Sequence, residues 1–198
     1  MSLLSNGGIK RMDDKYRGLE DIARNHYANV VWTHKIQEKQ AEIYELRYKV
    51  LAAINIVFAA LTSAGLISII FADPTWLKVA SAVVSFITTA ISAFLASFDY
   101  KSMAKDNKTA ATKLVCARDE LLSLLAKIKL RETPVSELMV VFDAIQKRVH
   151  EVYKDAPNTT NKAVKKAGVA LKEHKEGTYT DEEIDALLPD ELKRGSEK

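Results

Sequence analysis

The residues best suited to holding a metal ion or attacking a substrate are four histidines and one cysteine. His26 and His34 fall on one face of a predicted helix, but histidines that share a metal ion on one helix stand four residues apart, and Val30 occupies the midpoint. Cys116 lies within another predicted helix without a histidine near it in sequence, which is typical of a small packed side chain. We therefore expect packed histidines and no metal site.

Sequence patterns for phosphate binding and for a serine nucleophile are missing. The seven glycines are scattered, and no stretch reads G-x-x-x-x-G-K, G-x-G-x-x-G or G-x-S-x-G. A net charge of +3 over 198 residues is too small to favour a nucleic-acid-binding surface. We expect no catalytic residues, no cofactor and no nucleic-acid partner.

Two long apolar runs dominate the sequence instead. No residue from Val50 to Ala72, and none from Val79 to Phe98, carries an ionisable side chain. At about 1.5 Å per residue, each run forms a helix about 30 Å long, which matches the hydrocarbon core of a bilayer. A signal peptide would begin nearer the N-terminus, and a helix buried in a soluble bundle would carry a polar stripe. The sequence predicts an all-α protein with a transmembrane hairpin, its two spans at about 50–72 and 79–98.

The segment between the runs is short, from Asp73 to Lys78, and predicts a tight antiparallel turn because Pro74 cannot continue the first helix. Aromatic rings favour membrane–water interfaces. We predict that Trp76 anchors the interface near the turn and that the opposite interface is anchored by Tyr44, Tyr48 and Tyr100.

Lysine and arginine residues gather on the flanks away from the turn. They are Lys35, Lys39, Arg47 and Lys49 before the first run, and Lys101, Lys105, Lys108, Lys113 and Arg118 after the second. Because positively charged flanks stay in the cytoplasm, we expect a multi-pass membrane protein with both termini cytoplasmic.

Small residues recur every fourth position in both runs, a spacing that lets two membrane helices approach closely. Hairpin packing, contact between subunits and a hydroxyl-lined pore remain open for this set, which comprises Ala60, Ala64, Ser68, Ser81, Ser85, Thr89, Ala93 and Ser97. Asn55 carries the one carboxamide in either run, and it would bond the other helix or face a pore. The missing intramembrane charge argues against a proton-coupled transporter.

Apolar residues at helical spacing predict three cytoplasmic helices, at about 13–49, 99–130 and 134–153, which form a bundle or a coiled-coil stalk. The first runs directly into the first span. The third is predicted to start with Thr133 as N-cap and Pro134 in its first position. Together with the spans, these helices define a two-transmembrane domain over 13–153, after a disordered N-terminus at 1–12.

The remaining segment, 154–198, has a basic first half and an acidic second half. We interpret it as a charged, partly disordered tail. The alternative is a docking segment whose basic half reaches anionic lipid and whose Ile184, Leu187 and Leu188 bind a partner. Thr180 and Glu183 fit a capping box, which predicts a short helix.

Several of these features occur together in one known family. A cytoplasmic helix with Tyr27 and Trp32-Thr33-His34-Lys35 enters the hairpin, the chain leaves it through Phe98-Asp99-Tyr100, and a long helix follows with Leu114-Val115 and Arg118-Asp119-Glu120-Leu121-Leu122. Over roughly 13–153 the chain resembles the SLATT family, the prokaryotic two-span effectors associated with SMODS nucleotidyltransferases and SLOG sensors.

The resemblance implies an effector of bacterial conflict systems in the inner membrane, without catalytic residues. Such proteins are thought to open a pore or breach the membrane when a nucleotide signal or an infection sensor triggers them, and some relatives stand beside reverse transcriptases. Two spans cannot enclose an aqueous channel, so we expect a homo-oligomer in contact with membrane lipid. The upstream partner would be a nucleotide-signal enzyme, a sensor or a reverse transcriptase. The alternative function is a non-conducting membrane anchor that recruits a cytoplasmic partner through its tail.

Overall fold

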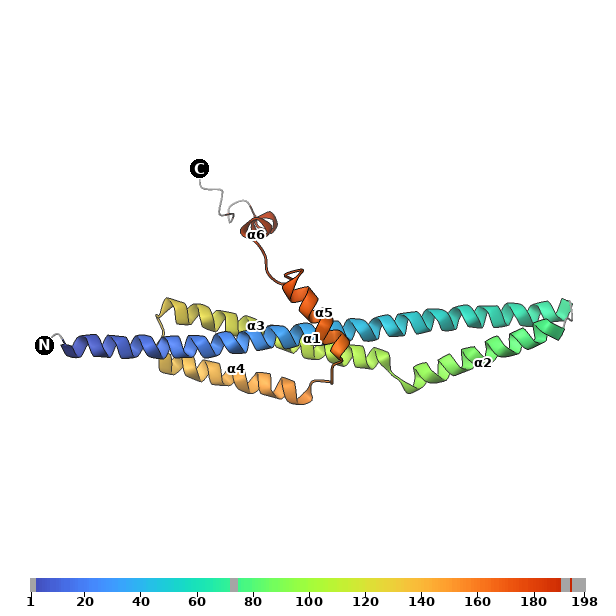
Figure 1. The fold of residues 1–198 in the computed structure, drawn as a ribbon, viewed down its shortest axis with the longest axis horizontal. Helices are drawn as coiled ribbons and strands as arrows, with labels where there is room; N and C mark the ends of the chain where they lie inside the picture. The colour runs from blue at the N-terminus through green and yellow to red at the C-terminus, as the bar shows by residue number, and fades with distance from the viewer. Residues whose placement is uncertain (1–2, 72–74, 190–192, 194–198) are drawn as a thin grey trace.

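The computed structural model describes residues 3–71, 75–189 and 193, and this part of the chain contains helices and no strands. The molecule is an elongated rod with an arm at its side (Figure 1). The longest element, α1 (Leu3–Phe71), has 69 residues, which amounts to about 100 Å. It runs unbroken from the charged region that precedes the first apolar run to the end of that run, as expected for a stretch without proline. It also begins at Leu3, where the sequence predicted disorder over 1–12.

The next two helices return along α1. Helix α2 (Thr75–Ser97) lies antiparallel to the second half of α1, and α3 (Tyr100–Leu130) continues along the first half (Figure 1). Pro74 lies outside the described residues, but Thr75 to Lys78 are already helical, so the turn is shorter than the predicted segment 73–78. The helix can start there because its first residues need no intrahelical partner for their N–H groups.

Helix α4 (Val135–Asp155) turns back once more and completes a three-helix bundle with α1 and α3. The predicted bundle is confirmed. Its core is apolar and almost fully buried: Leu19, Ala23, Val30, Leu114, Ala117, Leu121, Leu124, Ile128, Leu138, Phe142, Ile145 and Val149. This bundle forms a stalk that continues the long axis of the hairpin (Figure 1).

The connection between α3 and α4 differs slightly from the prediction. Arg131 ends α3 in the left-handed conformation (φ 58°), and its N–H donates to the carbonyl of Lys127. Pro134, at φ −57° and ψ 141°, is the N-cap of α4. The predicted cap at Thr133 is wrong by one residue, because the extended ψ of Pro134 keeps it outside the helix. The carbonyl of Thr133 instead accepts a hydrogen bond from the Tyr16 hydroxyl at 2.8 Å.

The tail is more ordered than the sequence indicated. Helix α5 (Asn161–Lys172) packs against α1 through Ala163, Ala167 and Ala170, whose exposed fractions are 0–2%. Helix α6 (Asp181–Leu187) has no buried residue, and its predicted capping box is present between Thr180 and Glu183. The part of 154–198 that contacts α1 is thus helical, which goes beyond the interpretation of this segment as a charged, partly disordered tail.

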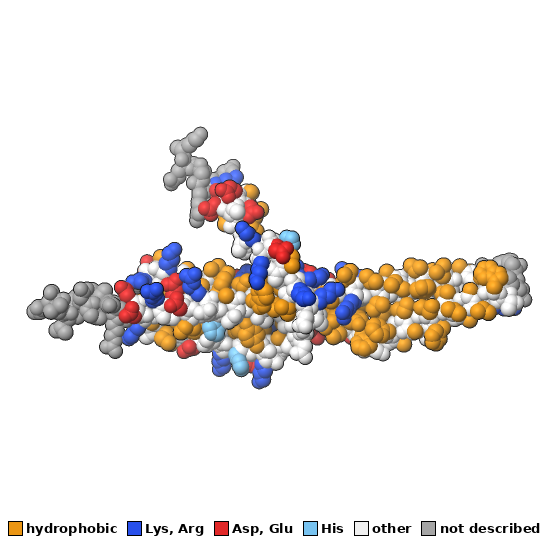
Figure 2. All heavy atoms as spheres, in the orientation of Figure 1, with side chains coloured by type: hydrophobic (Ala, Val, Ile, Leu, Met, Phe, Trp, Pro, Cys, Tyr) orange, Lys and Arg blue, Asp and Glu red, His pale blue; other side chains and the backbone are white. Residues whose placement is uncertain are grey.

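The apolar side chains of the hairpin lie on the outside of the molecule. Figure 2 shows them covering the half of the rod built by α2 and the end of α1, while charged groups cover the stalk and the arm. Two apolar helical segments are long enough to cross a membrane. Only 0% of the first segment and 6% of the second are buried within the protein. A core helix of a soluble protein would bury such a stretch, so this surface indicates contact with lipid.

Candidate functional site

The two spans meet along a regular seam. Apart from Ala52, which is also half-buried, the half-buried or buried positions are Leu51, Asn55, Phe58, Thr62 and Gly65 on α1, and Leu77, Ser81, Val84, Thr88, Ile91 and Leu95 on α2. Their spacing alternates between four and three residues, which is the heptad spacing of an antiparallel coiled coil. Gly65 and Ser81 face each other across the seam, and a β-carbon added to Gly65 would lie 2.4 Å from the Ser81 hydroxyl oxygen.

Most of the small residues singled out in the sequence lie outside this seam. Ser81 is 9% exposed and belongs to it, whereas the side chain of Ser68 lies outside the described residues. The others are exposed: Ala60, Ala64, Ser85, Thr89, Ala93 and Ser97. A row of every fourth residue drifts about 40° per step around a helix, so it leaves a seam that follows heptad spacing. For these six residues, exposure argues against hairpin packing, and contact between subunits or a pore stays a prediction.

Asn55 bridges the two spans. Its side-chain oxygen accepts a hydrogen bond from the Ser92 hydroxyl on α2 at 3.1 Å. Of the two roles left open by the sequence, this bond favours contact between the helices. A carboxamide within hydrocarbon needs such a partner, since the lipid offers none.

Five further hydroxyl groups of the spans form local hydrogen bonds. Five of them donate to the backbone carbonyl four residues earlier, at 2.8–3.1 Å: Thr62, Ser63, Thr88, Thr89 and Ser97. This bonding lets a hydroxyl face lipid without an unmet partner. The hydroxyl content of the spans is therefore compatible with both a lipid-facing and a pore-facing position.

An aromatic cluster closes the end of the hairpin next to the stalk, where α2 ends and Asp99 caps α3. Tyr44 and Tyr100 are each 8% exposed and lie 5.9 Å apart between ring centres, with Phe94 and Phe98 beside Tyr100. These two tyrosines fill the junction rather than presenting a face to the membrane interface. Of the proposed anchors, Tyr48 and Trp76 are the exposed ones, at 39% and 70%.

The histidines of α1 are part of the stalk packing. His26 lies 2.8 Å from the side-chain nitrogen of Gln146 and meets the Phe142 ring edge to face. His34 Nδ1 lies 3.1 Å from the Ala111 carbonyl, so this nitrogen carries the proton and donates. Burial lowers the pKa of His34, although that hydrogen bond and Glu38 oppose the shift. Within the described residues no group of three or more His, Cys, Asp or Glu could hold a metal ion.

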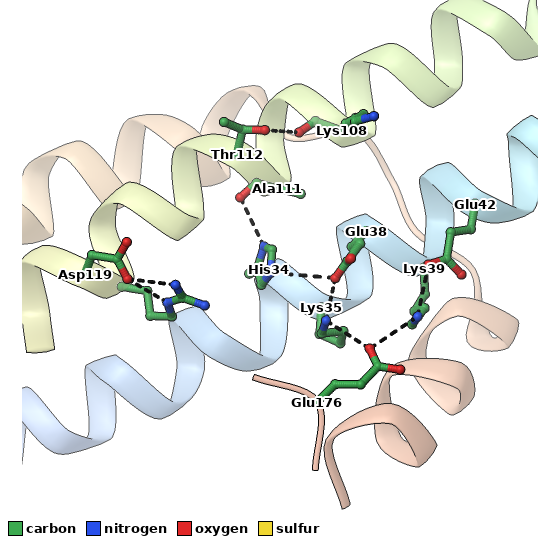
Figure 3. Close-up of polar contacts among 11 residues, drawn as sticks. His34, Lys35, Glu38, Lys39, Glu42, Lys108, Ala111, Thr112, Asp119 and Glu176 are labelled. Atoms are coloured by element: carbon green, nitrogen blue, oxygen red, sulfur yellow. Dashed lines mark hydrogen bonds and ion pairs between the residues drawn. The ribbon is translucent and has the colours of Figure 1, made fainter. Parts of the chain in front are cut away.

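The segment from 157 to 176 forms a strap across α1, which the sequence did not predict. Gln37 donates to the Pro157 carbonyl at 3.1 Å, and the side-chain oxygen of Gln40 accepts from both the N–H and the hydroxyl of Thr160 at 2.8 Å. At the other end, Glu176 accepts from Lys35 at 3.2 Å and pairs with Lys39 at 3.4 Å (Figure 3). Hydrogen bonding to Lys35 lowers the pKa of Glu176.

One sequence signal could have revealed the strap. Ala163, Ala167 and Ala170 recur at four and three residues, which is the pattern of a helix lying close against another helix. Lys172 also lies over the Trp32 ring, 5.6 Å from its centre. Polar residues of α1 that look solvated in the sequence, such as Gln37 and Gln40, are buried under this strap at 4% and 0% exposure.

Comparison with known proteins agrees with this architecture. The model of SMODS and SLOG-associating 2TM effector domain family 4 matches residues 19–183. The match extends beyond the predicted 13–153 and includes the strap and the start of α6. No curated protein and no solved structure matches the chain.

Proposed function

Because the chain belongs to SMODS and SLOG-associating 2TM effector domain family 4, we propose that it is a non-enzymatic membrane effector of a prokaryotic anti-phage system. In this proposal it oligomerises in the inner membrane and opens a pore or disrupts the bilayer. The trigger is a nucleotide signal or a sensor partner that acts on the cytoplasmic stalk. Two spans are too few to enclose a water-filled pore, so pore formation requires several copies of the hairpin.

The observation that supports oligomerisation is a difference between the two sides of the hairpin. Each helix has flanking residues on either side of its seam positions. In an antiparallel pair, the flanking residues reached by turning in the same direction around each helix lie on the same side of the hairpin. Over the half of the hairpin nearest the stalk, the residues on one side are small: Ala52 and Ala59 on α1, and Ser85 and Ser92 on α2. Lys78 follows in the same row of α2 toward the turn. On the other side the corresponding residues are bulky and exposed, namely Ile54 and Leu61 on α1 and Ile87 and Phe94 on α2, with the small Ala80 next in this row toward the turn.

We name the residues Ala52, Ala59, Ser85 and Ser92 the small side. Small residues let the backbone of a neighbouring hairpin approach closely, which is the main source of attraction between helices in lipid. The bulky side offers a surface suited to acyl chains. The small side carries the exposed Asn55–Ser92 hydrogen bond as well, so neighbouring copies would meet at the most polar part of the spans.

A size change on each side tests this proposal. Ser85→Leu adds bulk on the small side, and Ala80→Leu adds comparable bulk on the same helix but on the bulky side. Each variant is expressed with the native genomic neighbours, and a potential-sensitive dye is followed during phage challenge while subunit contacts are measured by cross-linking. We expect depolarisation and cross-links for the wild type and Ala80→Leu, and loss of both for Ser85→Leu. Unchanged polarisation of wild-type cells would count against a membrane-disrupting effector.

The second candidate function, a non-conducting scaffold, is favoured by α6. This helix is not packed on the rest of the chain, and Ile184 and Leu187 are 42% and 80% exposed. Deleting 178–198 removes α6 and leaves the strap in place. A scaffold would lose its function through this deletion, whereas an effector that acts through its hairpin would keep its toxicity.

A further inference from the structure

A basic groove lies at the cytoplasmic end of the hairpin. It has a volume of about 730 Å³ and runs between the end of the cytoplasmic part of α1 and the first turns of α3. Lys49 comes from α1, and Lys101, Lys105 and Lys108 come from α3. The three lysines of α3 are spaced by four and three residues, so they share one face over about 10 Å of helix.

The positive charge of the groove is only partly balanced. Its two carboxylates are Glu45 and Asp99. Glu45 pairs with Lys49 at 3.9 Å, and Asp99 accepts a hydrogen bond from the Ser102 N–H at 2.9 Å as the N-cap of α3. Lys101, Lys105 and Lys108 form no ion pair with any other described residue. Three lysines therefore line the groove without an ion pair to any described carboxylate.

The groove adjoins the apolar surface of the hairpin. Val50 and Ile54 follow it on α1, and Phe94 and Phe98 precede it on the returning chain, with exposed fractions of 38–48%. The polar headgroup layer of a bilayer extends only about 5–8 Å beyond the hydrocarbon on each side. Lys49 and Lys101 lie within one helical turn of that boundary, and Lys105 and Lys108 can extend toward it, because long side chains carry their charge outward along an apolar stem.

We propose that this groove binds the headgroup of an anionic phospholipid, whose acyl chains lie along the hairpin. The lysines supply the charge for the phosphate group, and the exposed ring of Tyr48 lies beside them at the level of the glycerol backbone. A soluble anion would leave the adjoining apolar wall uncovered, whereas a lipid covers both surfaces. The inference rests on the membrane insertion contained in the proposed function and does not require a pore.

Native mass spectrometry of the full chain tests this assignment. The protein is mixed in detergent with equal amounts of phosphatidylglycerol and phosphatidylcholine of identical acyl chains, and the retained lipids are counted. We expect several-fold preferential retention of phosphatidylglycerol. The triple variant Lys101→Gln/Lys105→Gln/Lys108→Gln should bring the ratio to parity. The control variant Lys113→Gln/Lys127→Gln/Lys129→Gln changes the same number of exposed lysines on the same helix and should keep the preference.

Three results would overturn the proposal: no headgroup preference in the wild type, equal loss in both triple variants, or displacement of the lipid by soluble glycerol phosphate at matching concentration. Circular dichroism of each variant confirms that the helices are intact. Failure of the membrane assignment has a different signature, because the protein would stay monodisperse without detergent and retain neither lipid. Retention of both lipids without preference overturns the groove alone.

Discussion

We expect the protonation of His34 to make the stability of the stalk depend on pH. Burial between α1 and α3 is the largest influence and lowers its pKa below 6.5, and Lys35 and Arg118 act in the same direction against Glu38 and the Ala111 carbonyl. In the unfolded chain the residue titrates near its ordinary value. Between the two values the unfolded chain binds more protons, so acidification favours unfolding. We expect the stability contributed by neutral His34 to be complete above pH 6.5 and to decrease as the pH falls from there toward the folded pKa.

Thermal unfolding of the detergent-solubilised protein at about pH 7.5 and 5.5 measures this effect. His34→Gln retains an amide that can donate to the Ala111 carbonyl but does not titrate. On acidification, the melting temperature of the wild type should decrease more than that of the variant. Equal losses would show that other groups carry the pH dependence.

Gly65 leaves room for the Ser81 hydroxyl across the hairpin. A β-carbon at residue 65 would lie 2.4 Å from the Ser81 hydroxyl oxygen but 3.5 Å from its β-carbon. Gly65→Ala should therefore destabilise the hairpin by about 1–3 kcal/mol, the usual cost of overpacking. Adding Ser81→Ala removes the clashing oxygen and should restore most of that loss. Melting temperatures of the four proteins in a double-mutant cycle measure the coupling, and strictly additive effects would contradict the contact.

The role of a single residue could be predicted from the sequence where its chemistry differs from that of its neighbours. Asn55 stands out within an apolar run, and its bond to Ser92 follows from the need for a partner in lipid. Tyr44 and Tyr100 could not be assigned, because an aromatic residue near a span fits the membrane interface and an interior contact equally well. Only the bend between α2 and α3 brings these two rings together.

The three-helix stalk depends on a row of α3 side chains that meet α1 and α4. Leu121 is 1% exposed in this core, whereas its neighbour Leu122 is 54% exposed. Leu121→Ala should lower the free energy of unfolding by about 2–5 kcal/mol, since it removes buried methyl groups and leaves a cavity. Leu122→Ala is the matched control and should change it by less than about 0.5 kcal/mol. Chemical denaturation followed by circular dichroism provides the comparison, and similar losses would place the core elsewhere.

The types of the long elements were predictable, because charge-free runs and helical periodicity extend over many turns. The strap was not, since its short helix buries alanines and carries lysines on its outer face, a composition that also fits a solvated segment. Its stability comes from tertiary contacts with Gln37, Gln40, Lys35 and Lys39, and these pair residues more than one hundred positions apart in sequence. Such distant pairings are invisible to a local pattern.

The arrangement of the whole molecule gives the proposed sidedness a direct test. The stalk and the hairpin tip lie at opposite ends of one rod (Figure 1), and the proposed topology places them on opposite sides of the membrane. In a Cys116→Ser background, Thr75→Cys places a thiol at the tip and Ser136→Cys places one at the far end of the stalk. With both termini cytoplasmic, a membrane-impermeant maleimide should label only residue 75 in intact cells and both positions in lysed cells. Labelling of residue 136 alone would reverse the orientation.

The contrast between the two spans has a mechanical consequence. Helix α1 passes from the stalk into the first span without a joint, whereas the chain between α2 and α3 is interrupted at Phe98 and Asp99. Torque applied to the distal end of the rod must therefore turn the first span by the same angle, while the second span can swivel and stay behind. A partner that merely rotates the stalk would shear one span against the other, without having to pull either of them through the bilayer.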